Sequence, residues 1–399
     1  MEARQQLDRE GTPAEVFGVF LRLGLTSFGG PIAHLGYYRS ALVNRRRWLG
    51  EEAYAEIVAL CQFLPGPTSS QVAFMLGLMR AGPMGALAAV IAFTAPSAGL
   101  MLLLGMTSRA FTGPLTDAIV HGLKIVAVVI VAQAVWGMAR TLTPDIRRAF
   151  IALASALAVM LMNDVVGQVF ALTLGALLGV LICGNNRFRH GDRISIPVSR
   201  WMGTACLIAF GTLLVGLPIA SHMLGWRELA LFDIFYRAGA LVFGGGHVVL
   251  PLLQTSLVEQ GWVGHDQFVA GYGAAQAIPG PLFSVAAYLG SVGDNGLILS
   301  LLALLGIFLP GYLILIGVLP FWTAIGESAL LSAAIAGINS SVVGILAFAL
   351  YDPLWTASVI SWRDMVLIAA ALIAVSRWTI PPIVTVAMVV FASVVMDMI

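Results

Sequence analysis

The chain has 399 residues, of which 59% are hydrophobic and only 10% are charged, and its formal net charge is +1. A mean hydropathy of +0.93 is too high for a water-soluble domain, so the composition predicts a polytopic membrane protein. The arginines cluster beside apolar segments and not on one soluble surface, which argues against a nucleic-acid partner. Cys61, Cys183 and Cys206 lie far apart without metal-ligand spacing, so we expect no disulfide framework, metal site or cofactor.

Apolar runs between charges and turn signals predict an all-α protein with thirteen membrane elements, six in each half and one between them. The first fifteen residues lack the pattern of a cleaved signal, so the N-terminus is expected in the cytoplasm. Two runs are shorter than the roughly 20 residues of a normal span, which gives an expected range of about 9 to 13 elements. In the first half the elements are expected near residues 16 to 37, 53 to 79, 84 to 106, 117 to 139, 149 to 162 and 165 to 183.

A polar connector at residues 185 to 200 precedes an unpaired element near 202 to 223. The predicted domains are an N-terminal repeat at 1–184, the connector with its linking helix at 185–228, and a C-terminal repeat at 229–399. In the second half the elements are expected near residues 230 to 252, 267 to 291, 296 to 318, 330 to 350, 364 to 376 and 379 to 396.

The two halves repeat one pattern, in which an FGG sequence is followed by a PGP sequence. The matching residues of the first half are Phe17, Phe20, Arg22, Gly24, Phe28, Gly29, Gly30, Trp48, Gly50, Gln62, Pro65, Gly66 and Pro67. Their counterparts are Phe232, Phe235, Arg237, Gly239, Phe243, Gly244, Gly245, Trp262, Gly264, Gln276, Pro279, Gly280 and Pro281. Because one unpaired element separates the copies, the second repeat should be inverted in the membrane, as in many transporters.

The glycines and prolines of FGG and PGP fall near the middle of their apolar runs, where they should interrupt helical continuity. If all thirteen elements cross the membrane, eleven connecting arginines lie inside and seven outside. If the interrupted elements are re-entrant, fifteen lie inside and only Arg109, Arg227 and Arg363 outside, which the positive-inside rule favours. Unpaired backbone at membrane depth is tolerated only inside protein or beside water, so the breaks predict a site.

Arg22 and Arg237 are the strongest candidates for substrate binding, because each lies six residues before its FGG break. A charge deep in the bilayer is costly unless it meets water, a partner or a ligand, and a guanidinium suits a tetrahedral oxyanion. The alternative is an arginine near a helix end that extends to the interface.

Each PGP break should open a new helix, whose free N–H groups and positive end suit an anion. Ser70 and Ser284 occupy equivalent positions just after the breaks and could add hydroxyl donors. Gln62 and Gln276, three residues before each PGP, could bind substrate or satisfy the broken backbone. The structural alternatives are prolines that only kink packed helices and glycines that only allow close helix packing.

Lys124 and His247 are additional candidates that occur in one half only, since the counterpart of Lys124 is Asn339. No proton pathway can be assigned, because the ionisable residues within or near apolar runs are not duplicated: Glu56, Asp164, His34, His121 and His247.

The doubled FGG and PGP segments, the chain length and the basic middle connector resemble the bacterial chromate ion transporters of the long, two-domain type. The resemblance implies a multi-pass inner-membrane carrier that exports chromate, driven by the proton motive force, with sulfate as a competing ligand. One departure is that the second FGG is followed by Gly246 and His247, whereas the first is followed by Pro31 and Ile32. The half-sites therefore need not contribute equally.

The predicted mechanism is alternating access, in which the inverted halves hold a dianion near the midplane and rock to expose it to either face. A carrier for sulfate or another oxyanion, or an anion channel, remains the alternative. An intramembrane enzyme is disfavoured, because the sequence shows no paired carboxylates on one helix, no metal-ligand spacing and no nucleophile with an obvious base. The lipid bilayer is the expected environment, protons are the expected coupling ion, and a homodimer is left open.

Overall fold

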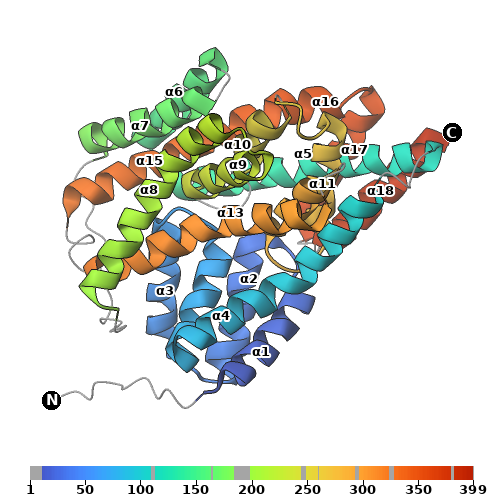
Figure 1. The fold of residues 1–399 in the computed structure, drawn as a ribbon. Helices are drawn as coiled ribbons and strands as arrows, with labels where there is room; N and C mark the ends of the chain where they lie inside the picture. The colour runs from blue at the N-terminus through green and yellow to red at the C-terminus, as the bar shows by residue number, and fades with distance from the viewer. Residues whose placement is uncertain are drawn as a thin grey trace.

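The computed structural model describes residues 11–108, 113–162, 165–183, 198–243, 249–258, 260–292, 296–322, 328–378 and 382–398. These parts are helical and contain no β-strand (Figure 1). The predicted class, an all-α membrane protein built from two repeats with broken helices, is confirmed.

The first repeat begins with two broken elements, continues through two long helices and ends in a pair of shorter ones. Its helices are α1 (Pro13–Thr26), α2 (Gly30–Tyr38), the π-helical η1 (Arg39–Arg45), α3 (Glu51–Phe63), α4 (Thr68–Thr107), α5 (Pro114–Leu142), α6 (Ile146–Met162) and α7 (Val165–Ile182). Within α4, the non-helical backbone of Ala81 and Gly82 marks the junction between two of the predicted elements.

The linking helix α8 (Arg200–Leu224) leads into a second repeat with the same order. Its helices are α9 (Arg227–Leu241), α10 (Val249–Leu257), α11 (His265–Ala277), η3 (Leu282–Ser284), α12 (Val285–Ser291), α13 (Gly296–Val318), η4 (Leu319–Phe321), α15 (Ala329–Ala349), η5 (Leu350–Trp355), α16 (Thr356–Ser358), α17 (Trp362–Trp378) and α18 (Pro382–Met398). Among the described residues α8 is the single helix between the repeats, so the odd spacing that predicts their inversion is retained.

Five helical segments of the described residues are long and apolar enough to cross a membrane. They lie at Thr68–Thr107, Pro114–Leu142, Arg200–Leu224, Gly296–Phe321 and Ala329–Ser358. By contrast, α6, α17 and α18 have 17 residues each. At 1.5 Å per residue such a helix is about 26 Å long, slightly less than the hydrocarbon core of a bilayer.

The predicted breaks are present wherever the structure describes them. Helix α1 ends at Thr26 and α2 begins at Gly30, while α3 ends at Phe63 and α4 begins at Thr68. With 14 residues, α1 reaches only about 21 Å, so it cannot span the bilayer alone. In the second repeat α11 ends at Ala277, and four residues separate it from η3. Whether each broken pair enters and leaves by one face stays a prediction.

The two repeats are intertwined, because helices of each pack against the end of the other (Figure 1). In the first repeat, α5 packs against α11, α17 and α18, while in the second α15 packs against α6 and α7. Small residues permit this close approach: Gly122 of α5 meets Val390 of α18, and Gly337 of α15 meets Gly175 of α7. Gly122 and Gly337 are equivalent positions, so the contacts follow an approximate two-fold relation.

A matching pair of glycines fixes the helix that precedes each FGG break. A Cβ at Gly24 of α1 would lie 2.7 Å from the carbonyl oxygen of Phe93 in α4. Its counterpart, Gly239 of α9, lies equally tight against the carbonyl oxygen of Ile307 in α13. Helices α1 and α9 therefore sit on the backbone of α4 and α13, and each break follows a few residues later.

Replacing Gly24 with alanine should destabilise the protein, because a backbone carbonyl cannot move aside as a flexible side chain can. Overpacking of this kind costs about 1–3 kcal/mol. We expect Gly24→Ala to lower the thermal unfolding midpoint in detergent by several degrees. Gly18→Ala on the same helix is the matched control, because a Cβ there meets nothing within 4 Å. Equal midpoints for the two variants would contradict the close α1–α4 packing.

Candidate functional site

Two reciprocal hydrogen bonds join the PGP break of each repeat to the FGG break of the other. The N–H of Gly66 donates to the carbonyl oxygen of Val242 at 2.7 Å, and the N–H of Gly280 donates to that of Ser27 at 2.9 Å. Gly66 and Gly280 are the central residues of the two PGP sequences, while Ser27 and Val242 directly precede Phe28 and Phe243. We call each bonded pair of breaks a crossover, and each is built from both repeats. The first crossover contains Gly66 and Val242, and the second contains Gly280 and Ser27.

Both crossovers need glycine at the centre of PGP. Gly66 has φ of 120° and Gly280 has φ of 108°, a region that residues with a side chain rarely adopt. A Cβ on Gly66 would lie 2.8 Å from the Cα of Gly311, and one on Gly280 would lie 2.7 Å from the Oγ of Ser97. Ser97 and Gly311 are themselves equivalent, each following a proline within a long helix. The sequence predicted the glycine breaks but not these helix positions opposite them.

Gln71, in the first turn of α4, satisfies broken backbone in the first crossover. Its Nε2 donates to the carbonyl oxygens of Pro65 and Gly311, both at 2.9 Å. Sequence reasoning had considered a backbone role for Gln62 instead, but that side chain is exposed. The signal that could have identified Gln71 is its polarity within the first turn after PGP.

The two predicted arginines occupy different environments. Arg22 projects from the exposed face of α1, and no acidic side chain among the described residues pairs with it. Arg237 is half-buried, and its Nε and Nη2 donate to the two carboxylate oxygens of Asp233 at 3.0 and 2.7 Å. The counterpart of Asp233 in the first repeat is Gly18, so the sequence symmetry of the arginines conceals an unequal charge balance. No described contact joins Arg22 to Arg237.

The remaining predicted residues are mostly close to the crossovers. Ser70 and Ser284 are buried at the starts of α4 and α12, and Pro65, Gly66, Pro67 and Gly280 lie in the turns themselves. Gln276 is buried, and its side chain lies against Tyr272. Phe28, Gly29, Gly30 and Pro279 are half-buried, while Pro281 is buried. Gly244, Gly245 and His247 lie outside the described residues.

The predicted residue Ser70 belongs to a group of buried polar side chains around the crossovers whose other members were not predicted to bind substrate. Ser27, His34, Tyr38, Ser70 and Gln71 each have 0% exposure, and each carries at least one polar atom without a hydrogen-bond partner in the described structure. The buried hydroxyl of Tyr312 likewise has none. The other members carry no shared sequence signal, because they come from the end of α1 and from α2, α4 and α13, and only the fold brings them together.

Lys124 is buried in α5 and forms an ion pair across the repeat boundary. Its Nζ lies 2.5 Å from Oδ1 of Asp266 at the start of α11, the helix that leads to the second PGP break. One turn earlier, Nε2 of His121 lies 3.0 Å from Oδ1 of Asp364 in α17. The Asp364 carboxylate also accepts the backbone N–H groups of Ile360 and Ser361. These two charged pairs thus join α5 to α11 and α17 of the second repeat.

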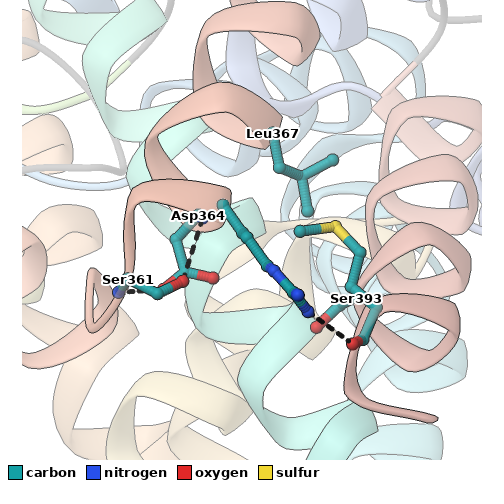
Figure 2. Close-up of a pocket in the computed structure, with 6 residues that line it drawn as sticks. Ser361, Asp364, Leu367 and Ser393 are labelled. Atoms are coloured by element: carbon teal, nitrogen blue, oxygen red, sulfur yellow. Dashed lines mark hydrogen bonds between the residues drawn. The ribbon is translucent and has the colours of Figure 1, made fainter. Parts of the chain in front are cut away.

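A cavity of about 300 Å³ lies between α17 and α18 (Figure 2). Its lining residues are Ser361, Arg363, Asp364, Leu367, Ser393 and Met396. Figure 2 shows Ser361 and Asp364 joined by hydrogen bonds at the start of α17. This reciprocal arrangement caps the helix, so the carboxylate has a structural role. The cavity contains none of the predicted site residues, and Arg363 and Asp364 balance each other in charge.

No group of three or more histidine, cysteine, aspartate or glutamate side chains in the described parts of the chain is arranged to hold a metal ion.

Comparison with known proteins gives one consistent result. The model of the chromate transporter family matches residues 14–180 and again residues 229–395. The chromate transport protein of Cupriavidus metallidurans is 29% identical over 89% of this chain and 84% of its own length. That of Pseudomonas aeruginosa is 27% identical over 83% of this chain and 79% of its own length. No solved structure matches.

An uncharacterised transporter of Methanocaldococcus jannaschii is also 26% identical over 86% of this chain and 85% of its own length. The family model matches once in each half of the chain, and the relatives match over most of their own length. Both findings agree with the two interlocked repeats of the fold. The protein is a multi-pass membrane protein that belongs to the chromate transporter family.

Proposed function

We propose that the protein is a secondary active transporter that exports chromate across the bacterial inner membrane. The observation that carries the proposal is the pair of reciprocal hydrogen bonds, because it makes each broken-helix junction a joint product of the two repeats. The family membership and the curated chromate transport proteins support chromate as the substrate. The bacterial relatives support the inner membrane as the location.

The proposed substrate site lies at the crossovers. The start of α4 presents free N–H groups beside Pro67, with the buried Ser70 hydroxyl one turn on. A helix start of this kind stabilises an oxyanion without a full countercharge. Arg22 and Arg237 then supply positive potential toward the site. Sulfate has the same shape and charge as chromate, so a carrier for sulfate or another oxyanion is the alternative substrate assignment.

Alternating access follows from the same contacts. If the repeats are related by an approximate two-fold axis in the membrane plane, exchanging their two conformations converts one access state into the other. The crossovers lie where the repeats meet, so a rocking motion would change the surroundings of a bound anion on both sides together. A channel would require an open path, and the buried Gly66 and Gly280 close against Gly311 and Ser97.

The ion pairs of α5 are candidates for coupling transport to protons. Protonation of Asp266, whose side chain is 72% exposed, would break its pair with the buried Lys124 and release α11 from α5. Movement of α11 would reach the PGP break that begins two residues after its end. The titratable groups gathered here are His121 and Lys124 of α5, His265 and Asp266 of α11, Asp352 of η5 and Asp364 of α17.

Removing the arginine charges should abolish anion flux without preventing membrane insertion. A charge-assisted hydrogen bond contributes about 1.5–3 kcal/mol, and its loss corresponds to at least about a tenfold change. We therefore expect inverted vesicles that carry Arg22→Ala to take up radiolabelled chromate at least about tenfold more slowly than the wild type. Arg22→Lys, which keeps the charge, is the control.

Because removing Arg237 alone leaves Asp233 buried and unpaired, the informative variant is Asp233→Ala combined with Arg237→Ala. Wild-type uptake by this double variant or by Arg22→Ala would refute the arginine role.

Neutralising Asp266 should leave the exchange of chromate intact and weaken the coupling of chromate transport to protons. We expect Asp266→Asn to retain chromate exchange but to lose most of the stimulation of uptake by a pH gradient in proteoliposomes. Glu52→Gln is the matched control, because Glu52 is the equivalent residue of the first repeat and is exposed. Undiminished stimulation in Asp266→Asn, or an equal loss in both variants, would contradict this coupling role.

A further inference from the structure

The crossovers are lined by buried polar atoms that make no hydrogen bond of normal geometry within the described protein. They are the Oγ of Ser27 and Ser70, both ring nitrogens of His34, the hydroxyl oxygens of Tyr38 and Tyr312, and the Oε1 of Gln71. Buried polar atoms in native proteins nearly always have partners, and in a bilayer there is no solvent to supply them. A single buried polar atom without a partner can be tolerated without a ligand. Six such side chains close together indicate that a ligand binds among them.

Neighbouring contacts link the six side chains to one another. The His34 ring lies beside the backbone of Ser27 and packs edge-on against Phe93, with 5.3 Å between ring centroids. Tyr38 packs against the same Phe93 at 5.4 Å.

Across the junction, Tyr312 lies next to Ser70 and close enough to Tyr38 for electrostatic interaction. Gln71 follows Ser70 and bonds Gly311, the neighbour of Tyr312. Ser27 accepts the crossover hydrogen bond from Gly280, so the group reaches the second PGP break as well.

We propose that Ser27, His34, Tyr38, Ser70 and Tyr312, together with the first turn of α4 that Gln71 anchors, form an oxyanion subsite between the repeats that binds a fully deprotonated tetrahedral dianion through neutral hydrogen-bond donors. This inference rests on the proposed oxyanion transport and adds the residues that contact and select the substrate.

The chemistry of the group favours an anion over a cation. Serine and tyrosine hydroxyls and a histidine N–H can all donate, and none of the six side chains is a carboxylate. The start of α4 adds the positive end of a helix beside Ser70. Chromate and sulfate accept hydrogen bonds at every oxygen, whereas phosphate near neutral pH keeps a proton that requires an acceptor. Because the potential donors outnumber the obligate acceptor of the group, Oε1 of Gln71, the subsite should prefer chromate and sulfate to phosphate.

The second repeat has no equivalent set. Ser27 corresponds to Val242, Gln71 to Val285 and Tyr312 to Ala98. The repeats differ in length by one residue between FGG and the matching tryptophan. With either alignment of this stretch, His34 corresponds to a valine and Tyr38 to a leucine. Only Ser70 has a polar counterpart, Ser284. The polar side chains proposed to bind the dianion consequently have no full counterpart related by the repeat symmetry.

Tyrosine-to-phenylalanine variants test the subsite, because they remove only a hydroxyl. Tyr38→Phe and Tyr312→Phe remove no protein hydrogen bond of normal geometry, although the Tyr312 hydroxyl lies next to Ser70. We therefore expect an unchanged or higher thermal unfolding midpoint together with a KM for chromate raised about tenfold or more. Tyr236→Phe is the matched control, because the Tyr236 hydroxyl donates to the carbonyl oxygen of Phe210 at 3.1 Å. It should lower the unfolding midpoint and leave the KM unchanged. A wild-type KM in both Tyr38→Phe and Tyr312→Phe would overturn the proposal.

A binding measurement separates this subsite from the proposed transport. Sulfate and chromate should raise the unfolding midpoint of the purified wild type and of Tyr236→Phe, while phosphate at the same concentration should not. Neither dianion should stabilise Tyr312→Phe at concentrations that stabilise the wild type. Stabilisation by sulfate without chromate transport would leave the subsite standing and refute the transport assignment. Equal stabilisation of wild type and Tyr312→Phe, or none of the wild type by either dianion, would overturn the subsite.

Discussion

The structure depends on one constraint, which is that a helix broken inside a membrane must find partners for its exposed backbone groups. Here each repeat provides the partner for the other. The N–H of Gly66 bonds Val242, and the N–H of Gly280 bonds Ser27. Glycine is required at both donors because of their positive φ and because Gly311 and Ser97 leave no room for a side chain. Neither repeat could satisfy its own breaks in this way alone, so the fold and the candidate site arise from the same contacts.

Duplication explains the shape of the molecule, and departure from duplication explains its chemistry. The two crossovers share backbone geometry, and the glycine contacts of α1 with α4 and of α9 with α13 are alike. Charge and polarity are distributed unequally. Arg237 is paired with Asp233, whereas Arg22 has no acidic partner in the described residues. Lys124 stands where the second repeat has Asn339, and most of the buried polar side chains at the crossovers have no polar counterpart in the other repeat. An axis of near-symmetry with unequal side chains suits a carrier that must alternate between two states and also bind one substrate.

The sequence was sufficient to predict the helical elements, the breaks and the repeat, because these depend on local composition and on a pattern visible by self-comparison. The kink at Ala81 and Gly82 and the ends of α1, α3 and α11 fall where glycine and proline indicated. It could not predict the partners across the repeats. Gln71 bonds Gly311, which is 240 positions away, and Lys124 bonds Asp266, which is 142 positions away. Such pairs carry no local signal, and Gln62 was considered for a backbone role because it is duplicated, although its side chain is exposed.

The central claim is that one oxyanion site at the crossovers is exposed alternately to the two sides of the membrane. Counterflow in proteoliposomes tests it most directly: vesicles loaded with unlabelled chromate are diluted into a trace of radiolabelled chromate without a pH gradient. The account predicts a transient accumulation of label above equilibrium that saturates with internal chromate and is inhibited by sulfate. Label that only equilibrates, at a rate independent of the internal chromate, would contradict alternating access and indicate a channel.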